Sequence, residues 1–249
     1  MDIITAHELS VGYGRAEVLR DISFAVPEGL ITAVVGVSGS GKSTLLKTLA
    51  GLLPPLGGSF DFAGCRVDYL SDASLRDLYG KIGVLYQDGA LLNGLTLNEN
   101  VALPVRMHYP ELPEDVVRDM VFAGLSQVEM AASAEKFPSE LSGGMRKRGA
   151  LARALVLDPE LVFCDEPSSG LDPITSSRLD DLLLQLKERF KMTLVVVTHE
   201  LRSIERVADR VLLLGDGGIR FSGEYAGLAA TDDAFIRTFF LRKARHDDT

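Results

Sequence analysis

Two patterns of hydrophobic and polar residues divide the chain. Up to about residue 87, and again beyond about residue 158, short runs rich in Val, Ile and Phe lie between glycine-containing turns and predict β-strands. The predicted strands are Ile3–Val11, Ile22–Val26, Gly58–Phe62, Gly83–Tyr86, Leu161–Cys164, Thr193–Thr198 and the hairpin Arg210–Leu214 with Ile219–Ser222. These runs predict a sheet-containing core that a segment of different character interrupts.

Helical periodicity dominates the intervening segment, from Asp88 to about Asp158. There, apolar residues recur every three to four positions around Leu97–Val105, Pro113–Ala123 and Ser142–Leu157. Outside the segment, helices are predicted at Thr44–Ala50, Pro173–Phe190 and Asp232–Lys243. Strands that alternate with helices predict an α/β fold with a mostly parallel sheet and an inserted helical segment.

The most specific chemical signal lies directly after the apolar, β-branched run Ile31–Val35, which predicts a buried strand. Residues 36–44 read Gly-Val-Ser-Gly-Ser-Gly-Lys-Ser-Thr and match the phosphate-loop pattern G-x-x-x-x-G-K-[ST] in full. In such a loop the backbone N–H groups surround phosphates, the lysine reaches the β- and γ-phosphates, and the following hydroxyl ligates Mg²⁺. We therefore expect a nucleotide on Gly36, Ser38, Gly39, Ser40, Gly41, Lys42, Ser43 and Thr44.

Two later strands also end in polar residues. Asp165 and Glu166 follow the run Leu161–Cys164, which we expect to lie beside the phosphate-loop strand. Asp165 would then hold Mg²⁺, and Glu166 would polarise an attacking water. His199 follows a neighbouring apolar strand and could hydrogen-bond the terminal phosphate. Either feature alone also fits an ordinary strand end, but the phosphate loop favours the catalytic interpretation.

A second anion-binding feature opens the predicted helix at Ser142. The sequence Leu141-Ser142-Gly143-Gly144-Met145 offers Ser142 as N-cap, and its small residues leave backbone N–H groups free to face an anion. The helix dipole favours negative charge at that end. Two phosphate-binding loops in one chain predict a nucleotide held between two copies of the protein.

Composition excludes several classes of protein. A net charge of −9 argues against a general nucleic-acid binder, which needs a basic surface. No run approaches the roughly 20 apolar residues of a membrane span, and the N-terminus lacks a signal-peptide pattern, so we expect a cytosolic chain. Cys65 and Cys164 lack metal-ligand spacing, and Cys164 is expected to be buried. A solvated helix face without a functional role is predicted for Arg202, Glu205, Arg206 and Asp209.

Together these motifs resemble the ATP-binding cassette (ABC) family of transporter ATPases, from Leu9 to about Gly223. Residues 36–44 resemble its Walker A loop, residues 161–166 its Walker B strand with the catalytic glutamate, and residues 141–145 its signature loop. The remaining matches are the Q-loop Gln87, the D-loop Ser169–Asp172, the switch histidine His199 and the adenine-stacking Tyr13.

The resemblance implies a P-loop NTPase fold and a role for each matching residue. Residues 1–249 would form one nucleotide-binding domain. Its core (1–87 and 159–249) would include an N-terminal antiparallel β-subdomain, and residues 88–158 would form the helical subdomain. The implied catalytic residues are Glu166, His199, Lys42 and Gln87, and the implied Mg²⁺ ligands are Ser43, Gln87 and Asp165. Tyr13, Ser142, Gly143, Gly144 and Asp172 would complete the ATP site.

Short phrases narrow the resemblance to one branch. Most family members end the signature loop in glutamine, whereas this chain has Met145. Met145, Gly89-Ala90-Leu91 and Asp172–Thr175 resemble the ATPases of MCE-type (Mla-like) lipid trafficking systems. The implied protein is a homodimeric ATPase on the cytoplasmic face of the inner membrane that powers phospholipid trafficking. Its implied partners are a separate permease, an MCE-type lipid-binding protein and a small regulatory subunit, with no nucleic acid.

Three alternatives remain, and the cassette motifs fit the first of them equally well. An importer ATPase for amino acids or other small solutes is opposed only by Met145 and the Gly89–Leu91 phrase. A DNA-repair or ribosomal ABC protein would carry a coiled-coil insertion or tandem cassettes, and the acidic charge disfavours both. A scaffolding subunit that binds ATP without hydrolysing it is opposed by the intact Glu166, His199 and Gln87.

Overall fold

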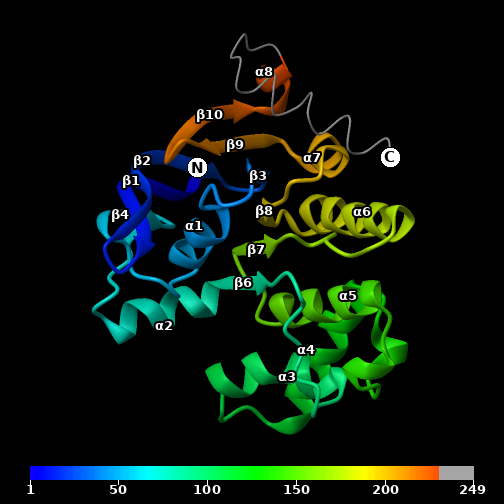
Figure 1. Cartoon of the computed structure of the whole chain (residues 1–249). Helices are drawn as coiled ribbons and strands as arrows, with labels where there is room; N and C mark the ends of the chain where they lie inside the picture. The colour runs from blue at the N-terminus through cyan, green and yellow to red at the C-terminus, as the bar shows by residue number, and fades with distance from the viewer. Residues whose placement is uncertain (230–249) are drawn as a thin grey trace.

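Two β-sheets carry the fold in the computed structural model, which describes residues 1–229 (Figure 1). The smaller sheet is antiparallel, in the order β2-β1-β4-β5, and consists of β1 (Asp2–Tyr13), β2 (Ala16–Pro27), β4 (Gly57–Phe62) and β5 (Cys65–Arg66). This confirms the expected N-terminal antiparallel subdomain. Strand β2 begins six residues before the predicted Ile22, because a tight turn at Gly14 (φ +61°) pairs Tyr13 directly with Ala16.

The larger sheet has six strands in the order β10-β9-β3-β8-β7-β6. Its strands are β3 (Ile31–Gly36), β6 (Ile82–Leu85), β7 (Leu161–Asp165), β8 (Thr193–Val197), β9 (Arg210–Gly215) and β10 (Gly218–Glu224). All pairs are parallel except β9–β10, the predicted hairpin, whose turn residues Asp216 and Gly217 both have positive φ, as a two-residue hairpin loop requires. The expected mostly parallel α/β sheet is confirmed.

Helices cover this sheet and extend below it in Figure 1. Around the sheets lie α1 (Lys42–Leu49), α2 (Asp72–Lys81), α6 (Pro173–Phe190), α7 (Leu201–Val207) and α8 (Tyr225–Ala229). The lower part consists of α3 (Leu97–His108), α4 (Glu114–Gln127) and α5 (Gly143–Leu155), with 3₁₀ turns at Ala131–Ser133 and Pro138–Glu140. The helix predicted at Asp232–Lys243 lies outside the described residues.

Helix α2 is absent from the prediction, for a physical reason. Leu75, Leu78 and Tyr79 have helical spacing, but this pattern is short and Leu78 is the only fully buried residue of the helix. The helix start is stabilised by an N-cap, because the Ser71 hydroxyl accepts a hydrogen bond from the Ser74 backbone N–H.

The larger sheet separates two apolar clusters. Successive residues of β7 alternate between them, so that Phe163 packs on one side and Val162 and Cys164 on the other. The Phe163 side includes α1 and the antiparallel sheet. The opposite side includes α6 and residues of α3, α4 and α5, such as Val121. The helical segment therefore shares one continuous apolar cluster with the sheet.

Asp209 departs from its predicted place on a solvated helix face. It lies beyond the end of α7, and its carboxylate accepts hydrogen bonds from the Ile31 backbone N–H at 2.8 Å and from Lys187 Nζ at 2.7 and 2.8 Å. It thus joins the first residue of β3 to α6. Within residues 1–229, no helix has the length and apolar content needed to cross a bilayer.

Candidate functional site

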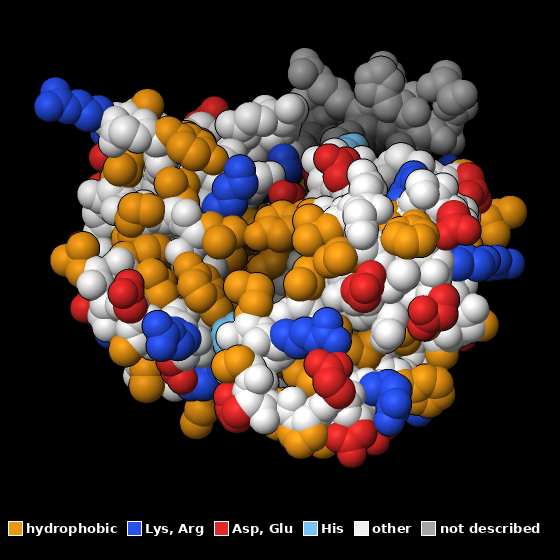
Figure 2. Space-filling view, turned by 90° about the horizontal axis from the view of Figure 1, so that it is seen from below, with side chains coloured by type: hydrophobic (Ala, Val, Ile, Leu, Met, Phe, Trp, Pro, Cys, Tyr) orange, Lys and Arg blue, Asp and Glu red, His pale blue; other side chains and the backbone are white. Residues whose placement is uncertain are grey.

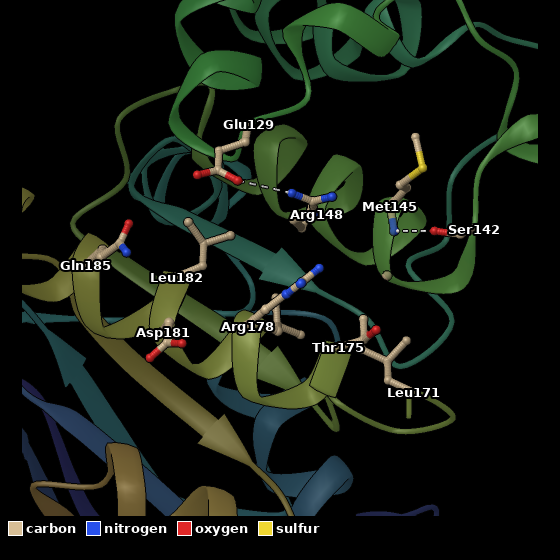
Figure 3. Close-up of a pocket in the computed structure, with 12 residues that line it drawn as sticks. Glu129, Ser142, Met145, Arg148, Leu171, Thr175, Arg178, Asp181, Leu182 and Gln185 are labelled. Carbon is tan, nitrogen blue, oxygen red and sulfur yellow. Dashed lines mark hydrogen bonds and ion pairs between the residues drawn. The ribbon is translucent and has the colours of Figure 1, made fainter. Parts of the chain in front are cut away.

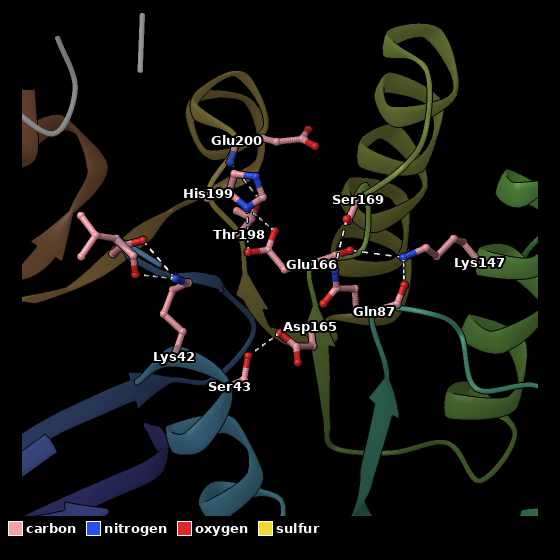
Figure 4. Close-up of polar contacts among 12 residues, drawn as sticks. Lys42, Ser43, Gln87, Lys147, Asp165, Glu166, Ser169, Thr198, His199 and Glu200 are labelled. Carbon is pink, nitrogen blue, oxygen red and sulfur yellow. Dashed lines mark hydrogen bonds and ion pairs between the residues drawn. The ribbon is translucent and has the colours of Figure 1, made fainter. Parts of the chain in front are cut away.

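Four parallel strands end at one edge of the larger sheet, and each is followed by a sequence motif. The register pairs Val197 of β8 with Val34 of β3 on one side and with Asp165 of β7 on the other. The expectation that β7 lies beside β3 is therefore wrong, because β8 intervenes. Contact still forms because α1 packs across β8 and β7, and Ser43 Oγ donates to Asp165 Oδ1 at 3.3 Å (Figure 4).

The phosphate loop between β3 and α1 has a conformation that suits glycine. Gly41 has φ +97°, and a Cβ there would lie 2.8 Å from Val18 Cγ1. Lys42 is buried, and its Nζ donates to the carbonyl oxygens of Gly36 and Val37, each at 3.0 Å. Burial lowers the Lys42 pKa, and the nearby Glu166 and Asp165 oppose that shift.

The loop also contains a donor that suits a phosphate oxygen. Ser40 Oγ is buried and lacks a hydrogen-bond partner within the part of the chain that the structure describes. A buried hydroxyl without a partner is costly, so a ligand oxygen at this position would remove the penalty. The loop therefore fits the phosphates of a nucleotide.

Ser43 and Asp165 form a pair of oxygen ligands that suits Mg²⁺. Burial raises the Asp165 pKa, and the Ser43 hydrogen bond opposes that shift. Residues 1–229 contain no group of three His, Cys, Asp or Glu side chains placed to hold a metal. Mg²⁺ is commonly bound by one or two carboxylates together with substrate phosphates, so a hydroxyl and one carboxylate fit it. The third predicted ligand, Gln87, instead directs its Nε2 to Ser169 Oγ at 3.3 Å.

Glu166 occupies a sharp turn immediately after β7. Its φ of +47° is uncommon for a residue other than glycine, and such backbone strain clusters at functional sites. The Glu166 N–H donates to the Val197 carbonyl oxygen at 2.8 Å, which fixes the turn against β8. Its carboxylate lies 2.7 Å from His199 Nδ1, so the structure brings these two predicted residues together (Figure 4).

One buried cation beside this turn is not among the predicted site residues. Lys147 of α5 is 6% exposed, and its Nζ donates to the carbonyl oxygens of Gln87 and Glu166, the latter at 3.3 Å. A signal was present, because Lys147 precedes the buried Ala150 and Leu151 by three and four positions and so lies on the apolar face of its helix.

The signature loop forms the first turn of α5. Ser142 is the N-cap, as predicted, and its Oγ accepts a hydrogen bond from the Met145 N–H at 3.3 Å. Gly144 lies so close to α6 that a Cβ would be 2.5 Å from Thr175 Cγ2. Met145 packs against the apolar cluster beneath the helix, which accounts for an apolar side chain there. The loop borders a groove of about 430 Å³ between α5 and α6 (Figure 3).

Two predicted nucleotide contacts, the signature loop and Asp172, lie beside the start of α6 rather than in the phosphate loop of their own chain. In Figure 1 the start of α5 lies to the right of strands β6 and β7, whereas α1 lies to their left. Tyr13 is half-exposed at the end of β1. Asp172 caps α6 by accepting hydrogen bonds from the N–H groups of Ile174 and Thr175, and its bonds to Thr175 lower its pKa.

The family model for ABC transporters matches residues 19–169 of this chain. The chain belongs to the ABC transporter family. The family resemblance drawn from the motifs is thereby confirmed, and nucleotide binding follows as a family property.

Curated relatives of this ABC protein match nearly all of its length. A protein of Mycobacterium tuberculosis named as a probable ribonucleotide transport ATP-binding protein, mkl, is 37% identical over 95% of this chain. The chain spans 66% of that relative's length. The intermembrane phospholipid transport ATP-binding protein MlaF is 36% identical over 96% of this chain in both Haemophilus influenzae and Escherichia coli. The match covers 90% and 88% of those two proteins, respectively.

Solved ABC structures share the fold. The CbiO1 protein of Clostridium perfringens, part of the cbiONQ transporter complex, superposes with a TM-score of 0.84 at 29% identity and covers 98% of this chain and 96% of its own. The dimeric cassette MJ0796 bound to ADP and Pi has a TM-score of 0.79 at 29% identity over 89% of this chain and 98% of its own.

Proposed function

We propose that this ABC protein hydrolyses ATP as one of two identical subunits and that hydrolysis powers phospholipid movement through a separate membrane permease. The observation that carries the proposal is the gathering of Lys42, Asp165, Glu166 and His199 at one sheet edge, with the signature loop on the other side of that edge. Such a site holds the parts that phosphoryl transfer to water requires.

Each residue at the edge has a role in the proposed reaction. Lys42 turns its ammonium from the loop carbonyls to the β- and γ-phosphates, and Tyr13 stacks on the adenine. Ser43 and Asp165, with Gln87, would hold Mg²⁺, which would supply positive charge against the phosphate oxygens. The Glu166 carboxylate orients the attacking water and accepts its proton. His199, 2.7 Å from that carboxylate, donates to the γ-phosphate.

The proposed subunit works as a pair because its two anion sites are separated. Ser142, Gly143 and Gly144 at the start of α5 lie away from the phosphate loop of the same chain, so they would cover the nucleotide of a second copy. Asp172, which caps the adjacent α6, contributes at the same interface. The dimeric form of the structurally similar MJ0796 cassette supports this arrangement. Hydrolysis removes the γ-phosphate that both copies grip, and the pair loosens.

A hydrophobic face supports docking on a permease. Figure 2 shows hydrophobic side chains gathered around a hollow on the face viewed from below. Leu92 and Met107 are exposed apolar residues of the helical segment, and Leu52 is exposed beside α2. An exposed apolar patch of this kind marks a site of protein or membrane contact. We place the permease here, on the cytoplasmic face of the inner membrane, with an MCE-type lipid-binding protein and a small regulatory subunit in the same complex.

Phospholipid is the proposed cargo because the MlaF relatives match this chain over more of their own length than mkl does. The MlaF proteins align over 96% of this chain and at least 88% of their own length, whereas 66% of mkl is matched. The Met145 and Gly89–Leu91 phrases resemble the same branch. Ribonucleotide transport, for which mkl is named, and amino-acid import are the competing outcomes of the test below.

The catalytic proposal is tested by Glu166→Gln. This variant should bind ATP and lower turnover by at least about 100-fold, because it loses the proton acceptor. It should also accumulate an ATP-bound dimer, measured by light scattering. Adding Ser142→Arg to it should abolish that dimer while nucleotide affinity of the monomer stays unchanged. Normal ATPase activity in Glu166→Gln would refute the catalytic assignment, and a dimer that survives Ser142→Arg would refute the shared site.

The transport proposal is tested by purifying the tagged chain from its native membrane. A multi-span permease and phospholipid should co-purify, and ATP hydrolysis should rise when the complex is reconstituted in phospholipid vesicles. Recovery with an amino-acid-binding protein would refute the phospholipid assignment. So would ATPase activity that is stimulated by ribonucleotides other than ATP but not by phospholipid.

A further inference from the structure

A closed ring of hydrogen bonds joins four motifs at the catalytic edge (Figure 4). Lys147 Nζ donates to the carbonyl oxygens of Gln87 and Glu166. The Glu166 carbonyl oxygen also accepts from the Ser169 N–H at 3.1 Å, and Gln87 Nε2 returns to Ser169 Oγ at 3.3 Å. The ring thus contains the Q-loop, the helix of the signature loop, the catalytic glutamate and the D-loop.

Burying the charged Lys147 side chain in this ring costs free energy. Its ammonium is buried, and the hydrogen bonds it makes within residues 1–229 go to carbonyl oxygens rather than to a carboxylate. Burial lowers its pKa, although Asp88, Glu166 and Asp165 oppose that shift. A buried charge without a bonded counter-ion is weak evidence for a stabilising role, since an apolar residue of similar volume is often as stable.

The Q-loop end of the ring is fixed to the helical segment. Arg153 of α5 donates to the carbonyl oxygens of Gly89 and Ala90 at 2.9 and 2.7 Å. The buried Asn100 of α3 accepts from the Leu92 N–H at 2.7 Å and donates to nearby loop carbonyls. The loop 87–96 is therefore hydrogen-bonded to α3 and α5, while the turn at Glu166 is hydrogen-bonded to the sheet.

The Glu166 end of the ring is a backbone group in a strained turn. Its N–H is anchored to Val197 of β8, and its φ of +47° lies in the left-handed region. A pull on the carbonyl of a residue held at its N–H rotates the backbone between the two, and the side chain turns with it. A shift of α5 relative to the sheet would therefore act on the Glu166 backbone and, through it, on the carboxylate that contacts His199.

We propose that Lys147 is a positioning residue that couples the Glu166 carboxylate to the placement of the helical segment. When α5 is seated on the sheet, the ammonium holds the Glu166 carbonyl and aims the carboxylate for water activation. When α5 shifts, as a permease or a second copy would cause, the ring opens and hydrolysis slows. This proposal rests on the proposed role of Glu166 and adds to it Lys147, a residue with no assigned part in nucleotide binding.

The test compares Lys147→Met with Lys147→Arg and with Lys136→Met, a matched change at an exposed lysine of the same segment. Lys147→Met should lower kcat about 10-fold, as the loss of one charge-assisted hydrogen bond would. The KM for ATP should stay within about twofold, because Lys147 is not among the residues proposed to bind the nucleotide. Lys147→Arg should recover most of kcat, and Lys136→Met should match the wild type.

Two further readouts separate positioning from a purely structural role. The melting temperature of Lys147→Met should stay within about 3 °C of wild type, because the lost bonds are offset by removal of a buried charge. Combining Lys147→Met with Ser169→Ala should lower kcat no further than the slower single variant, because members of one network are not additive. If Lys147→Met fails to fold, the same criteria apply to Lys147→Gln.

Wild-type kcat in the Lys147 variant, a fall that Lys147→Arg leaves unrescued, or additive effects with Ser169→Ala would overturn the proposal. Glu166→Gln is assayed in parallel. If that variant is inactive while Lys147→Met is normal, the Lys147 proposal alone fails. If Glu166→Gln retains full turnover, the proposed catalytic function fails and the Lys147 proposal falls with it.

Discussion

Replacing Asp209 with alanine removes the anchor of the strand that leads into the phosphate loop. The Asp209 carboxylate accepts from the Ile31 N–H at 2.8 Å, where β3 begins, and from Lys187 Nζ of α6 at 2.7 Å. Ile31 is fully buried, so its N–H would have no solvent partner after the substitution. The change therefore leaves both a buried donor and an ammonium without their acceptor.

The expected loss of unfolding free energy is the sum of two contributions. A hydrogen bond from a buried N–H to a charged group contributes roughly 1.5–3 kcal/mol. The ion pair is partly exposed, at 21% for Lys187 and 30% for Asp209, so solvent screening limits it to about 1 kcal/mol or less. Asp209→Ala should therefore cost about 2–4 kcal/mol, and Lys187→Met, which spares the Ile31 bond, about 1 kcal/mol or less.

Urea unfolding followed by circular dichroism measures both variants. A matched control is Asp181→Ala, which removes the more exposed ion pair with Arg206 and should cost less than about 1 kcal/mol. The denaturant slope should remain that of the wild type, so that the change in midpoint reports stability. A loss below about 1 kcal/mol for Asp209→Ala, or one equal to that of Lys187→Met, would contradict the anchoring role of the Ile31 bond.

Three further outcomes follow from the described side chains. Burial raises the Cys164 pKa to about 12, so a thiol reagent at pH 8 should label Cys65 alone until urea is added; labelling of both in the native protein would contradict this. Because burial raises the Asp165 pKa, its charged form destabilises the fold above that raised pKa and the penalty vanishes below its usual value. Asp165→Asn should therefore raise the melting temperature at pH 7 but not near pH 3. An equal shift at both pH values would contradict a penalty from burying the charged carboxylate. Gly144→Ala should cost about 1–3 kcal/mol through its clash with Thr175 Cγ2, and Thr175→Ser, which lacks that methyl, should restore most of the loss.

Local sequence signals were enough to predict most of the elements and the motif positions. The run Ile31–Val35, the N-cap Ser142 and the hairpin turn at Asp216–Gly217 each act within a few residues, and the structure forms all three. The pairing of β8 with β7 also agreed with the prediction, which placed His199 near Asp165. Strand ends shifted by a few residues where a turn or a partner strand extended the ladder.

What the sequence could not supply depends on contacts between distant residues. The insertion of β8 between β3 and β7 is a property of chain topology, and apolar runs of similar composition do not encode their order. Asp209 was misjudged because its partners lie 22 and 178 residues away. The position of Lys147 on the apolar face of its helix predicts that it is buried. Its role could not be predicted, because its acceptors are backbone carbonyls of two other segments.

The shared apolar cluster beneath the sheet sets how the helical segment can change and move. Residues such as Leu97, Val121 and Leu151 fill the same interior as Val162 and Val196, so excising the segment would open the sheet to water. The segment is therefore unlike a domain that was added to a finished core, and heating should melt both parts in one transition. Movement that preserves such an interior is limited to sliding of packed side chains, so small displacements at the lower face must suffice to change the chemistry at the sheet edge.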